Sequence, residues 1–526
     1  MIDTLKLKVE KLSLSETGAF TANLLDYLDQ NPKLEKFVGS YPSIESFDAA
    51  IQNRQFPPES RRSLVKVLNQ QYSGLVLSGK LIKNITALKN DQSFTVTTGH
   101  QLNIFTGPLF FIYKIVSTIR VCQILKEHYP AYDFVPVYWM ASEDHDYAEI
   151  NHFNLFGKEY RWDCPQHGAV GHFQLDGLSG IIEQIRDCPD FFEDAYLNSS
   201  NLAEATRKIV NHLFGDYGLI VLDPDHPDLK STFSPLMKDE LLQQNTFQQV
   251  SASTEDIANN GYKTLVSPRE INLFYLKEQL RERIVRAEGK YEVLGTDISF
   301  TEQQLLDELD QHPERFSPNV IMRTVYQETI LPNLAYIGGP GELTYWMQFK
   351  SVFDHYQIPF PILIPRNNAL VISKSLAKKI DKLELKVADL FLSDQELKSK
   401  FIEKNSNATL DLQAEQQQLK LVFEQIHDKI KAIDGSLTGY IKAEENKALK
   451  NLHQIEKRLK KAEEQNQEIA VNQLLGVKEK LFPDGNLQER HQNFLNFYIN
   501  NPQFIEDLME HLDPFDFSFY VLFENG

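Results

Sequence analysis

Short apolar runs recur along the first two thirds of the chain, and longer segments with helical periodicity separate them. The runs are SFTVTT at 93–98, DFVPVYWM at 133–140, GLIVL at 218–222, NVIM at 319–322 and FPILIP at 360–365. Apolar runs of this length predict buried strands. The segment LFFIYKIVSTIRVCQILKEHY, between the first two runs, has the period of a helix. Buried strands that alternate with helices predict an α/β fold with a mainly parallel sheet.

The regular alternation is interrupted between residues 155 and 310. We expect this interval to form one or more insertions on the sheet. The predicted core domain, with its insertions, covers residues 1–375.

From residue 376 the pattern changes to a heptad repeat, and Gly and Pro become rare. Apolar side chains at positions a and d of a heptad predict helices that pack in a coiled coil. The first seam contains Leu412, Leu419, Phe423, Ile426, Ile430 and Ile433, and the second contains Ile441, Ala448, Leu452, Ile455, Leu459 and Ala462. The DGS sequence at 434–436 separates the seams, so an antiparallel hairpin is expected within 376–480. At about 1.5 Å per residue, each arm is roughly 40 Å long.

The hairpin has two interpretations. It is either a solvated arm that packs on its own domain or a surface that binds a partner, most simply a second copy of the chain. We favour a homodimer. Residues 481–526 are less polar and end in DFSFYVLFENG, so we expect this C-terminal segment to return to the core and supply a last strand or a docking segment.

Charge and cysteine content narrow the functional classes. The 526 residues carry a formal net charge of −19, which argues against non-specific binding to nucleic acid or to anionic membranes. A local basic pocket for one small anion remains compatible with this charge. Three cysteines without metal-type spacing, no signal-peptide pattern at the N-terminus and no apolar run of about 18 residues favour a cytoplasmic protein.

The first candidate site is TTGHQLNIFTGPLFF at 97–111, between a predicted strand and a predicted helix. Glycines allow close backbone approach to a ligand, and a helix N-terminus attracts an anion such as phosphate. An ordinary capped turn is the alternative, but it needs fewer polar residues. The candidate residues are Thr98, Gly99, His100, Gln101, Asn103, Thr106 and Gly107.

The second candidate site is ASEDHDYAEINHF at 141–153, directly after a predicted strand. The crowded ionisable groups are Glu143, Asp144, His145 and Asp146. Carboxylates placed this close repel each other, which raises the pKa of one of them unless a cation is present. His145 beside carboxylates is a candidate general base. His145, Glu149 and His152 could share one helix face, but their order is not that of the H-E-x-x-H zinc motif, and we expect no metal.

Two further stretches complete the set. AYIGGPGELTYWMQF at 335–349 offers a glycine-rich loop with an acidic residue and two aromatic side chains, and a bare turn is its alternative. PRNNALVISKSLAKKI at 365–380 offers an arginine that can bind a carboxylate or phosphate through two hydrogen bonds, and a basic helix start is its alternative. The candidates are Tyr336, Gly338, Gly339, Gly341 and Glu342 in the first stretch, and Arg366, Asn367 and Lys374 in the second.

Taken together and in this order, these stretches resemble the bacillithiol biosynthesis cysteine-adding enzymes, a family of cysteine ligases. The matching segments are TTGHQLNIFTGPLFFIYK, PVYWMASEDHDYAEINH, RTVYQETILPNLAYIGGPGELTYWMQ, FPILIPRNN and LFPDGNLQER. The resemblance covers essentially the whole chain. It implies a Rossmann-like core related to the class I nucleotidyltransferases, and a coiled-coil domain that forms a dimer.

The resemblance also implies a reaction, in which the cysteine carboxyl group is joined to the amino group of glucosaminyl-malate in the last step of bacillithiol synthesis. ATP/ADP is the expected nucleotide pair. Activation as an acyl phosphate, activation as an acyl adenylate, and arrival of cysteine in some other activated form are left open. The superfamily motifs match only partly, since His100 supplies one histidine of H-x-G-H and Ser373, Lys374 and Ser375 resemble K-M-S-K-S.

Roles for the candidate residues follow as hypotheses. His100, Thr106 and Gly107 hold a phosphate or the activated acyl group. Asp144, His145 and Asp146 bind or deprotonate the amine. Arg366 holds the malate carboxylate and Glu342 binds sugar hydroxyls. Two rival functions remain, a nucleotidyl- or glycosyltransferase that uses the same pocket and a non-catalytic dimeric scaffold.

Overall fold

The computed structural model describes residues 7–406 and 410–524. The chain divides into two compact units. Residues 19–370 and 487–522 make up most of the first unit, and residues 371–486 make up most of the second. Within the described residues, no helix is both long and apolar enough to cross a bilayer.

The centre of the first unit is a five-stranded parallel sheet, which confirms the predicted fold class. Its spatial order is β13 (Ile362–Pro365), β12 (Asn333–Gly338), β2 (Ser93–His100), β3 (Asp133–Met140) and β6 (Ile220–Leu222). All four neighbouring pairs are parallel. The first strand of this sheet along the chain, β2, therefore lies in the middle, which is the strand order of Rossmann folds. The order reverses between β2 and β12.

One predicted strand is wrong. NVIM at 319–322 begins helix α13 (Val320–Ile330) instead of forming a strand. The Asn319 side chain accepts hydrogen bonds from the N–H groups of Ile321 and Met322, at 2.9 and 3.1 Å, and so caps the helix. The strand that fills this place in the sheet is β12. A four-residue apolar run cannot distinguish a strand from a first helical turn.

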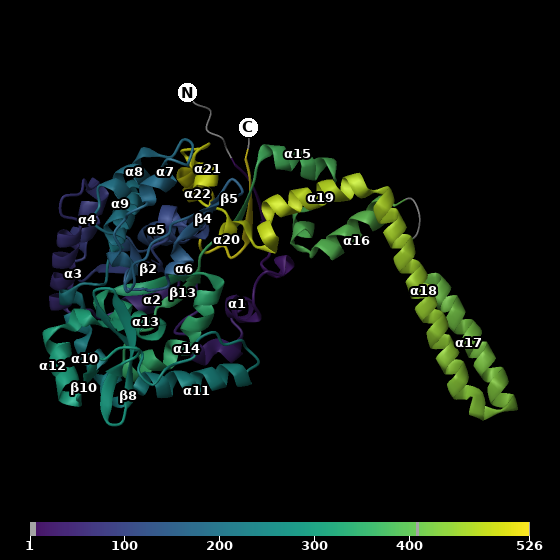
Figure 1. The fold of residues 1–526 in the computed structure, drawn as a ribbon, viewed down its shortest axis with the longest axis horizontal. Helices are drawn as coiled ribbons and strands as arrows, with labels where there is room; N and C mark the ends of the chain where they lie inside the picture. Colours follow the sequence, from purple (N-terminus) through teal and green to yellow (C-terminus); the bar gives the residue numbers. More distant parts are fainter. Residues whose placement is uncertain (1–6, 407–409, 525–526) are drawn as a thin grey trace. The chain divides into compact units, whose positions relative to one another are not determined.

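Helices cover the sheet (Figure 1). Helix α5 (Phe110–His128) connects β2 to β3 and packs on both strands. Helix α14 (Pro340–Tyr356) connects β12 to β13 and packs on α11 (Asn245–Asn259). The core between the sheet and its helices includes buried Phe94, Val96 and Ile337.

Two insertions extend the sheet. The first joins β3 to β6 and contains α6 (Tyr147–Ile150), β4 (His152–Leu155), β5 (Lys158–Arg161), α7 (Leu178–Ile182), α8 (Asp190–Leu197) and α9 (Leu202–Phe214). The second joins β6 to β12 and contains α10 (Pro227–Gln243), α11, β7 (Leu273–Lys277), β8 (Leu280–Ala287), β9 (Lys290–Val293), β10 (Ser299–Phe300), α12 (Glu302–Gln311), β11 (Phe316–Pro318) and α13. Its strands form an antiparallel sheet in the order β10-β9-β8-β7-β11.

The remaining elements of the first unit come from both ends of the chain. The helices are α1 (Ala22–Leu28), α2 (Ser46–Asn53), α3 (Pro58–Gln71), α4 (Gly79–Ala87), α20 (Gln488–His491), α21 (Leu495–Tyr498) and α22 (Phe504–His511). A separate three-stranded sheet has the order β1 (Lys8–Leu12), β15 (Phe519–Phe523) and β14 (Asn368–Ile372). The predicted last strand at the C-terminus is thus β15.

The second unit is helical. Its helices are α15 (Lys374–Lys382), α16 (Asp394–Asn405), α17 (Gln413–Ile433), α18 (Thr438–Asn466) and α19 (Glu468–Leu481). Helices α17 and α18 form the hairpin and lie side by side (Figure 1). At about 1.5 Å per residue, they are about 31 and 43 Å long.

The predicted seam of the hairpin is only partly correct. In α17, Phe423 and Ile426 are half-buried, but Ile433 is 85% exposed at the helix end. In α18, Ile455 and Leu459 are 49% and 41% exposed. No residue of α17 or α18 is fully buried, because a two-helix hairpin covers only one face of each helix.

Candidate active site

A large cavity of the first unit lies at the carboxyl edge of the parallel sheet. It measures about 680 Å³. Gly99 and His100 reach it from the end of β2, and Tyr336 and Gly339 reach it from β12 and the loop after it. The cavity therefore lies where the strand order reverses, the usual ligand site of an open α/β sheet.

The cavity gathers many of the residues that the sequence indicated. Those that line it are Gly99, His100, Gln101, Asp144, His145, Asp146, Tyr336, Gly339, Gly341, Glu342 and Arg366. Those that do not are Thr98, Asn103, Thr106, Gly107, Glu143, Gly338, Asn367 and Lys374. The two groups come from the same sequence motifs, so the motifs mix residues that face the cavity with residues that support it.

His100 ends β2, and its ring stacks on Phe110 with 5.2 Å between ring centroids. Burial, reinforced by the charges of Lys114 and Arg366, holds the pKa of His100 well below its usual range. The imidazole is therefore neutral at physiological pH. Its Nε2 is buried and has no hydrogen-bond partner among the described residues, so it is available to a ligand in the cavity.

Lys114 on α5 lines the same cavity as His100. Its Nζ lies 2.8 and 2.7 Å from the two carboxylate oxygens of Glu342 and also donates to the carbonyl of Gly99. Burial lowers the pKa of Lys114, while the Glu342 carboxylate opposes that shift. The same carboxylate accepts hydrogen bonds from the Gly339 N–H at 2.7 Å and the Tyr336 hydroxyl at 3.1 Å. Glu342 thus has three donors of its own, which disfavours its predicted role in binding sugar hydroxyls.

Arg366 is also paired within the protein. Its Nη2 donates to Glu489 Oε1 at 2.6 Å, and both side chains are 1% exposed. Its Nη1 donates to the carbonyl of Asn367 at 2.9 Å. The guanidinium group lies 5.1 Å from the centre of the Phe110 ring, and Arg490 from α20 lies 5.9 Å from the same ring. The C-terminal segment therefore adds Arg490 to the cavity and anchors Arg366.

Asp144 and His145 face two arginines of the second insertion. Asp144 lies 3.8 Å from Arg281 and 3.5 Å from Arg323. Burial alone raises the pKa of the Asp144 carboxyl, but Arg323, Arg281 and the His145 N–H outweigh it and lower the pKa. Nη1 of Arg281 also contacts Nδ1 of His145. Because an arginine N–H can only donate, this Nδ1 accepts and the ring proton lies on Nε2.

Asp146 is the free carboxylate of this group. It is exposed, lines the cavity, and makes no side-chain hydrogen bond or ion pair with the described residues. Its carboxylate, Asp144 and His145 offer ligand atoms within 4.8 Å of one another. Arg281 and Arg323 already neutralise Asp144, and Arg281 occupies His145 Nδ1, so the local charge favours proton transfer over binding of a cation. The predicted helix face does not form, because α6 begins after His145 and ends before His152.

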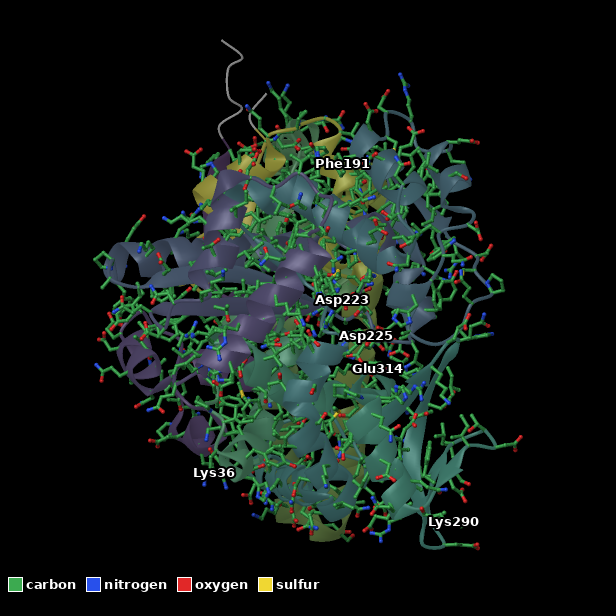
Figure 2. The ribbon with its side chains drawn as sticks, turned by 90° about the vertical axis from the view of Figure 1, so that its left-hand side faces the viewer. Lys36, Phe191, Asp223, Asp225, Lys290 and Glu314 are labelled. Carbon is green, nitrogen blue, oxygen red and sulfur yellow. The ribbon has the colours of Figure 1, made fainter. Side chains whose placement is uncertain are left out.

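Glu143 points away from the cavity. It contacts the ammonium group of Lys230, whose side chain is 0% exposed. The same ammonium group lies 3.2 Å from Asp225 Oδ1 and donates to the carbonyl of Glu314 at 3.2 Å; Asp225 and Glu314 are labelled in Figure 2. Glu143 is therefore an anchor of the 141–146 loop.

The loop after β2 is buried rather than open to a ligand. Thr106 is 5% exposed and has a φ of 67°, and a Cβ on Gly107 would lie 2.5 Å from that of Asn103. Nδ2 of Asn493 donates to the carbonyls of Phe105 and Gly107, at 2.8 and 2.6 Å. The backbone of this loop is thus held by the C-terminal segment, and Gly107 is needed there because its φ is 59° and a Cβ would clash with Asn103.

The remaining residues outside the cavity have structural partners. The Thr98 hydroxyl donates to the carbonyl of Ile337 on the neighbouring strand at 2.8 Å. A Cβ on Gly338 would lie 2.6 Å from Leu343. Nδ2 of Asn367 donates to the carbonyl of Asp513 at 2.7 Å. Lys374 begins helix α15 of the second unit.

The sequence interpretation missed most of the cations of the cavity. They are Lys114, Arg269, Arg281, Arg283 and Arg323, and Arg490 of the LFPDGNLQER segment lines the cavity as well. Two features of the sequence could have indicated some of these cations. Lys114 interrupts an apolar helical segment, and Arg281 and Arg283 are spaced for one face of a strand. With Arg366, seven cationic side chains line the cavity against four carboxylates, those of Asp144, Asp146, Glu149 and Glu342. The cavity is thus positive in a chain of net charge −19, which suits anionic ligands.

The fold and the site together define a Rossmann-like α/β protein with a cationic cavity at its switch point, extended by a coiled-coil hairpin. The chain belongs to the bacillithiol biosynthesis BshC family. The model of the family's N-terminal Rossmann-like domain matches residues 7–367, and the model of its C-terminal coiled-coil domain matches residues 369–524.

Similar proteins match over nearly their whole length. A protein of Cytophaga hutchinsonii named "Putative cysteine ligase BshC" is 42% identical over 510 residues, which cover 97% of this chain and 98% of that protein. A protein of the same name from Flavobacterium johnsoniae is 42% identical over 524 residues, which cover 97% and 99%. One from Bacillus cereus is 25% identical over 542 residues, which cover 98% and 100%.

Proposed function

We propose that this protein is a ligase that joins the carboxyl group of cysteine to the glucosamine amine of glucosaminyl-malate, the last step of bacillithiol synthesis. The observation that carries the proposal is the cationic cavity at the switch point, with a free carboxylate and a neutral histidine on its walls. The names of the similar proteins support the cysteine ligase assignment.

Amide formation needs an activated carboxyl group and a neutral amine. We propose ATP as the activator, because Lys114 and Arg490 line the cavity close to His100 and its stacking partner Phe110, where anionic phosphates would be stabilised. The amine nitrogen attacks the activated carbonyl carbon, the new C–N bond forms, and the bond to the phosphate or adenylate leaving group breaks. Asp146 accepts the proton that the amine loses, since Asp144 is held by two arginines.

The test is to incubate pure protein with glucosaminyl-malate, cysteine and each nucleotide, and to search for bacillithiol by mass spectrometry. We expect a product equal in mass to the two substrates less one water, formed only with ATP. Release of ADP and phosphate would indicate an acyl phosphate, and release of AMP and pyrophosphate an acyl adenylate.

Two outcomes would contradict the proposal. Nucleotidyl or glycosyl transfer without an amide product would favour a transferase that uses the same cavity. Full bacillithiol production by both His100→Ala and Asp144→Ala variants in a deletion strain would show that the cavity is not the active site, as a scaffold function requires.

A further inference from the structure

Two arginines of the cavity have no charged partner. Within residues 7–406 and 410–524, the guanidinium groups of Arg269 and Arg283 make no hydrogen bond or ion pair, and Nε of Arg283 is buried without a partner. Both line the cavity. Both belong to the second insertion, Arg283 on β8 and Arg269 on the loop before β7.

The backbone holds both arginines in place. Arg283 pairs with Phe274 across the β7–β8 ladder, and it is two residues from Arg281, so both arginines lie on one face of β8. The peptide N–H and carbonyl of Arg269 are bonded to the buried Asn272 side chain at 3.1 and 2.8 Å. Asn272 is in turn held by Glu240 at 2.8 Å. The backbone at both positions is thus fixed, and the guanidinium groups keep their N–H donors for an anion.

The charges at this end of the cavity do not balance. Arg269, Arg281, Arg283 and Arg323 supply four positive charges. The carboxylates beside Arg281 are those of Asp144, Glu143 and Asp146, and Glu143 is already paired with Lys230. Two positive charges therefore remain uncompensated. A ligand group with two negative charges would neutralise them.

We infer that Arg269 and Arg283 form the subsite for a dicarboxylate group of the substrate. Arg366, which the sequence suggested for this role, already pairs with Glu489 and is 1% exposed, whereas Arg269 and Arg283 are free to form two hydrogen bonds each with a carboxylate. The identification of the dicarboxylate as the malate part of glucosaminyl-malate rests on the proposed function. The subsite itself rests on the geometry and charge of these arginines.

This placement also orients the substrate. Asp144, His145 and Asp146 line the cavity together with Arg281, which contacts His145. A substrate held by its malate at Arg269 and Arg283 would present its amine toward Asp146, and the cations near β2 would remain for the activated cysteine. The subsite thus selects the acceptor by its two carboxylates.

The test uses malate alone and, as a monocarboxylate control, lactate, each titrated calorimetrically into the full chain. We expect malate to bind more tightly than lactate. Arg269→Gln and Arg283→Gln should each weaken malate binding by about tenfold or more, the usual effect of losing a hydrogen-bonded charge. Arg283→Lys should recover only part of the affinity, because it keeps the charge but loses the paired geometry.

Arg286→Gln is the matched control. Arg286 lies on the same strand, three residues on, and faces Glu302 and Tyr291 instead of the cavity. Its variant should bind malate as the unaltered protein does. Circular dichroism and thermal unfolding of each variant establish that it is folded before its affinity is compared.

Three results would overturn the inference: no malate binding by the unaltered protein up to millimolar concentration, equal binding of malate and lactate, or unchanged malate affinity in both arginine-to-glutamine variants.

The proposed function is tested separately from the subsite. If the protein binds malate through Arg283 but forms no amide with any nucleotide, the subsite stands and the ligase assignment does not. If it forms the amide, the two variants should raise the KM for glucosaminyl-malate and change kcat less.

Discussion

At the scale of single residues, ionisable side chains of the same chemical type differ in the partners that they contact. Of the four ionisable residues in SEDHD, Glu143 is tied to Lys230, Asp144 to two arginines and His145 to Arg281. Asp146 alone keeps an uncommitted carboxylate in the cavity. The residue type therefore does not determine the role; the neighbouring charges do.

Replacing Asp146 by Asn should abolish most of the amide-forming activity. We expect kcat to fall by about 100-fold or more, the usual effect of removing a general base, with little change in the free energy of unfolding because Asp146 is exposed. Asp163→Asn, which changes an exposed carboxylate outside this cavity, should retain full activity. An Asp146→Asn variant with normal kcat would assign proton transfer to another group.

His172 gives a pH dependence of stability. Its Nε2 lies 2.8 Å from Asp225, and this hydrogen bond raises the pKa of His172, although burial opposes the shift. A group whose pKa is raised on folding stabilises the protein below its unfolded pKa of about 6.5, and this contribution disappears as the pH rises through the folded pKa. The contribution is small, because the side chain is 56% exposed and solvent screens the pair.

Urea unfolding of His172→Gln at pH 6 and at pH 8.5 tests this dependence. The loss of unfolding free energy relative to the unaltered protein should be larger at pH 6. His167→Gln, an exposed histidine without a charged partner among the described residues, should show no such difference. Equal losses for His172→Gln at both pH values would show that the ion pair does not contribute.

At the scale of elements, the sequence predicted what periodicity determines and missed what capping determines. The apolar runs at 93–98, 133–140, 218–222 and 360–365 contain strands β2, β3, β6 and β13. The run at 319–322 became the start of a helix through the Asn319 cap. Strand β12 was hidden in a segment read as the approach to a glycine-rich loop, because strand and loop residues share the same stretch.

The residues of the cavity also divide into those that the sequence indicated and those that it did not. Residues in glycine-rich and acidic motifs could be found from the sequence, since they follow strands of the sheet. Arg269 and Arg283 could not, because they come from an insertion that reaches the cavity only through tertiary packing. Their pairing state depends on contacts between segments distant in the chain.

The loop between β2 and α5 should depend on Asn493. Asn493→Ala would leave the buried carbonyls of Phe105 and Gly107 without their donor. Because each unsatisfied buried group costs about 1–3 kcal/mol, we expect the free energy of unfolding in urea to fall by about 2 kcal/mol or more. Asn500→Ala, at an exposed position in the same segment, should change it little. Equal stability of both variants would show that other contacts hold the loop.

At the scale of the whole molecule, the helical hairpin leaves apolar side chains uncovered within the chain. Leu421 and Val422 on α17 are 57% and 49% exposed, and Ile455 and Leu459 on α18 are 49% and 41% exposed. Apolar side chains that stay exposed on both helices of a coiled coil are typical of helices that pack against further helices. We therefore propose that the 60.7 kDa chain forms a homodimer through the hairpin.

A dimer of this kind should dissociate when exposed apolar positions of the hairpin are replaced by charged residues. Ile455→Glu with Leu459→Glu places two carboxylates where apolar side chains would meet, so light scattering during gel filtration should give the mass of one chain, and the unaltered protein twice that mass. The control is Ala443→Glu with Asn446→Glu, which adds the same charge at exposed positions of α18 that lie about 120° or more from Ile455 and Leu459 at 100° per residue, and it should stay dimeric. A monomeric unaltered protein, or a charged variant that remains a dimer, would contradict the assembly. Because the cavity is built from residues of the first unit alone, a folded monomeric variant should keep its malate affinity.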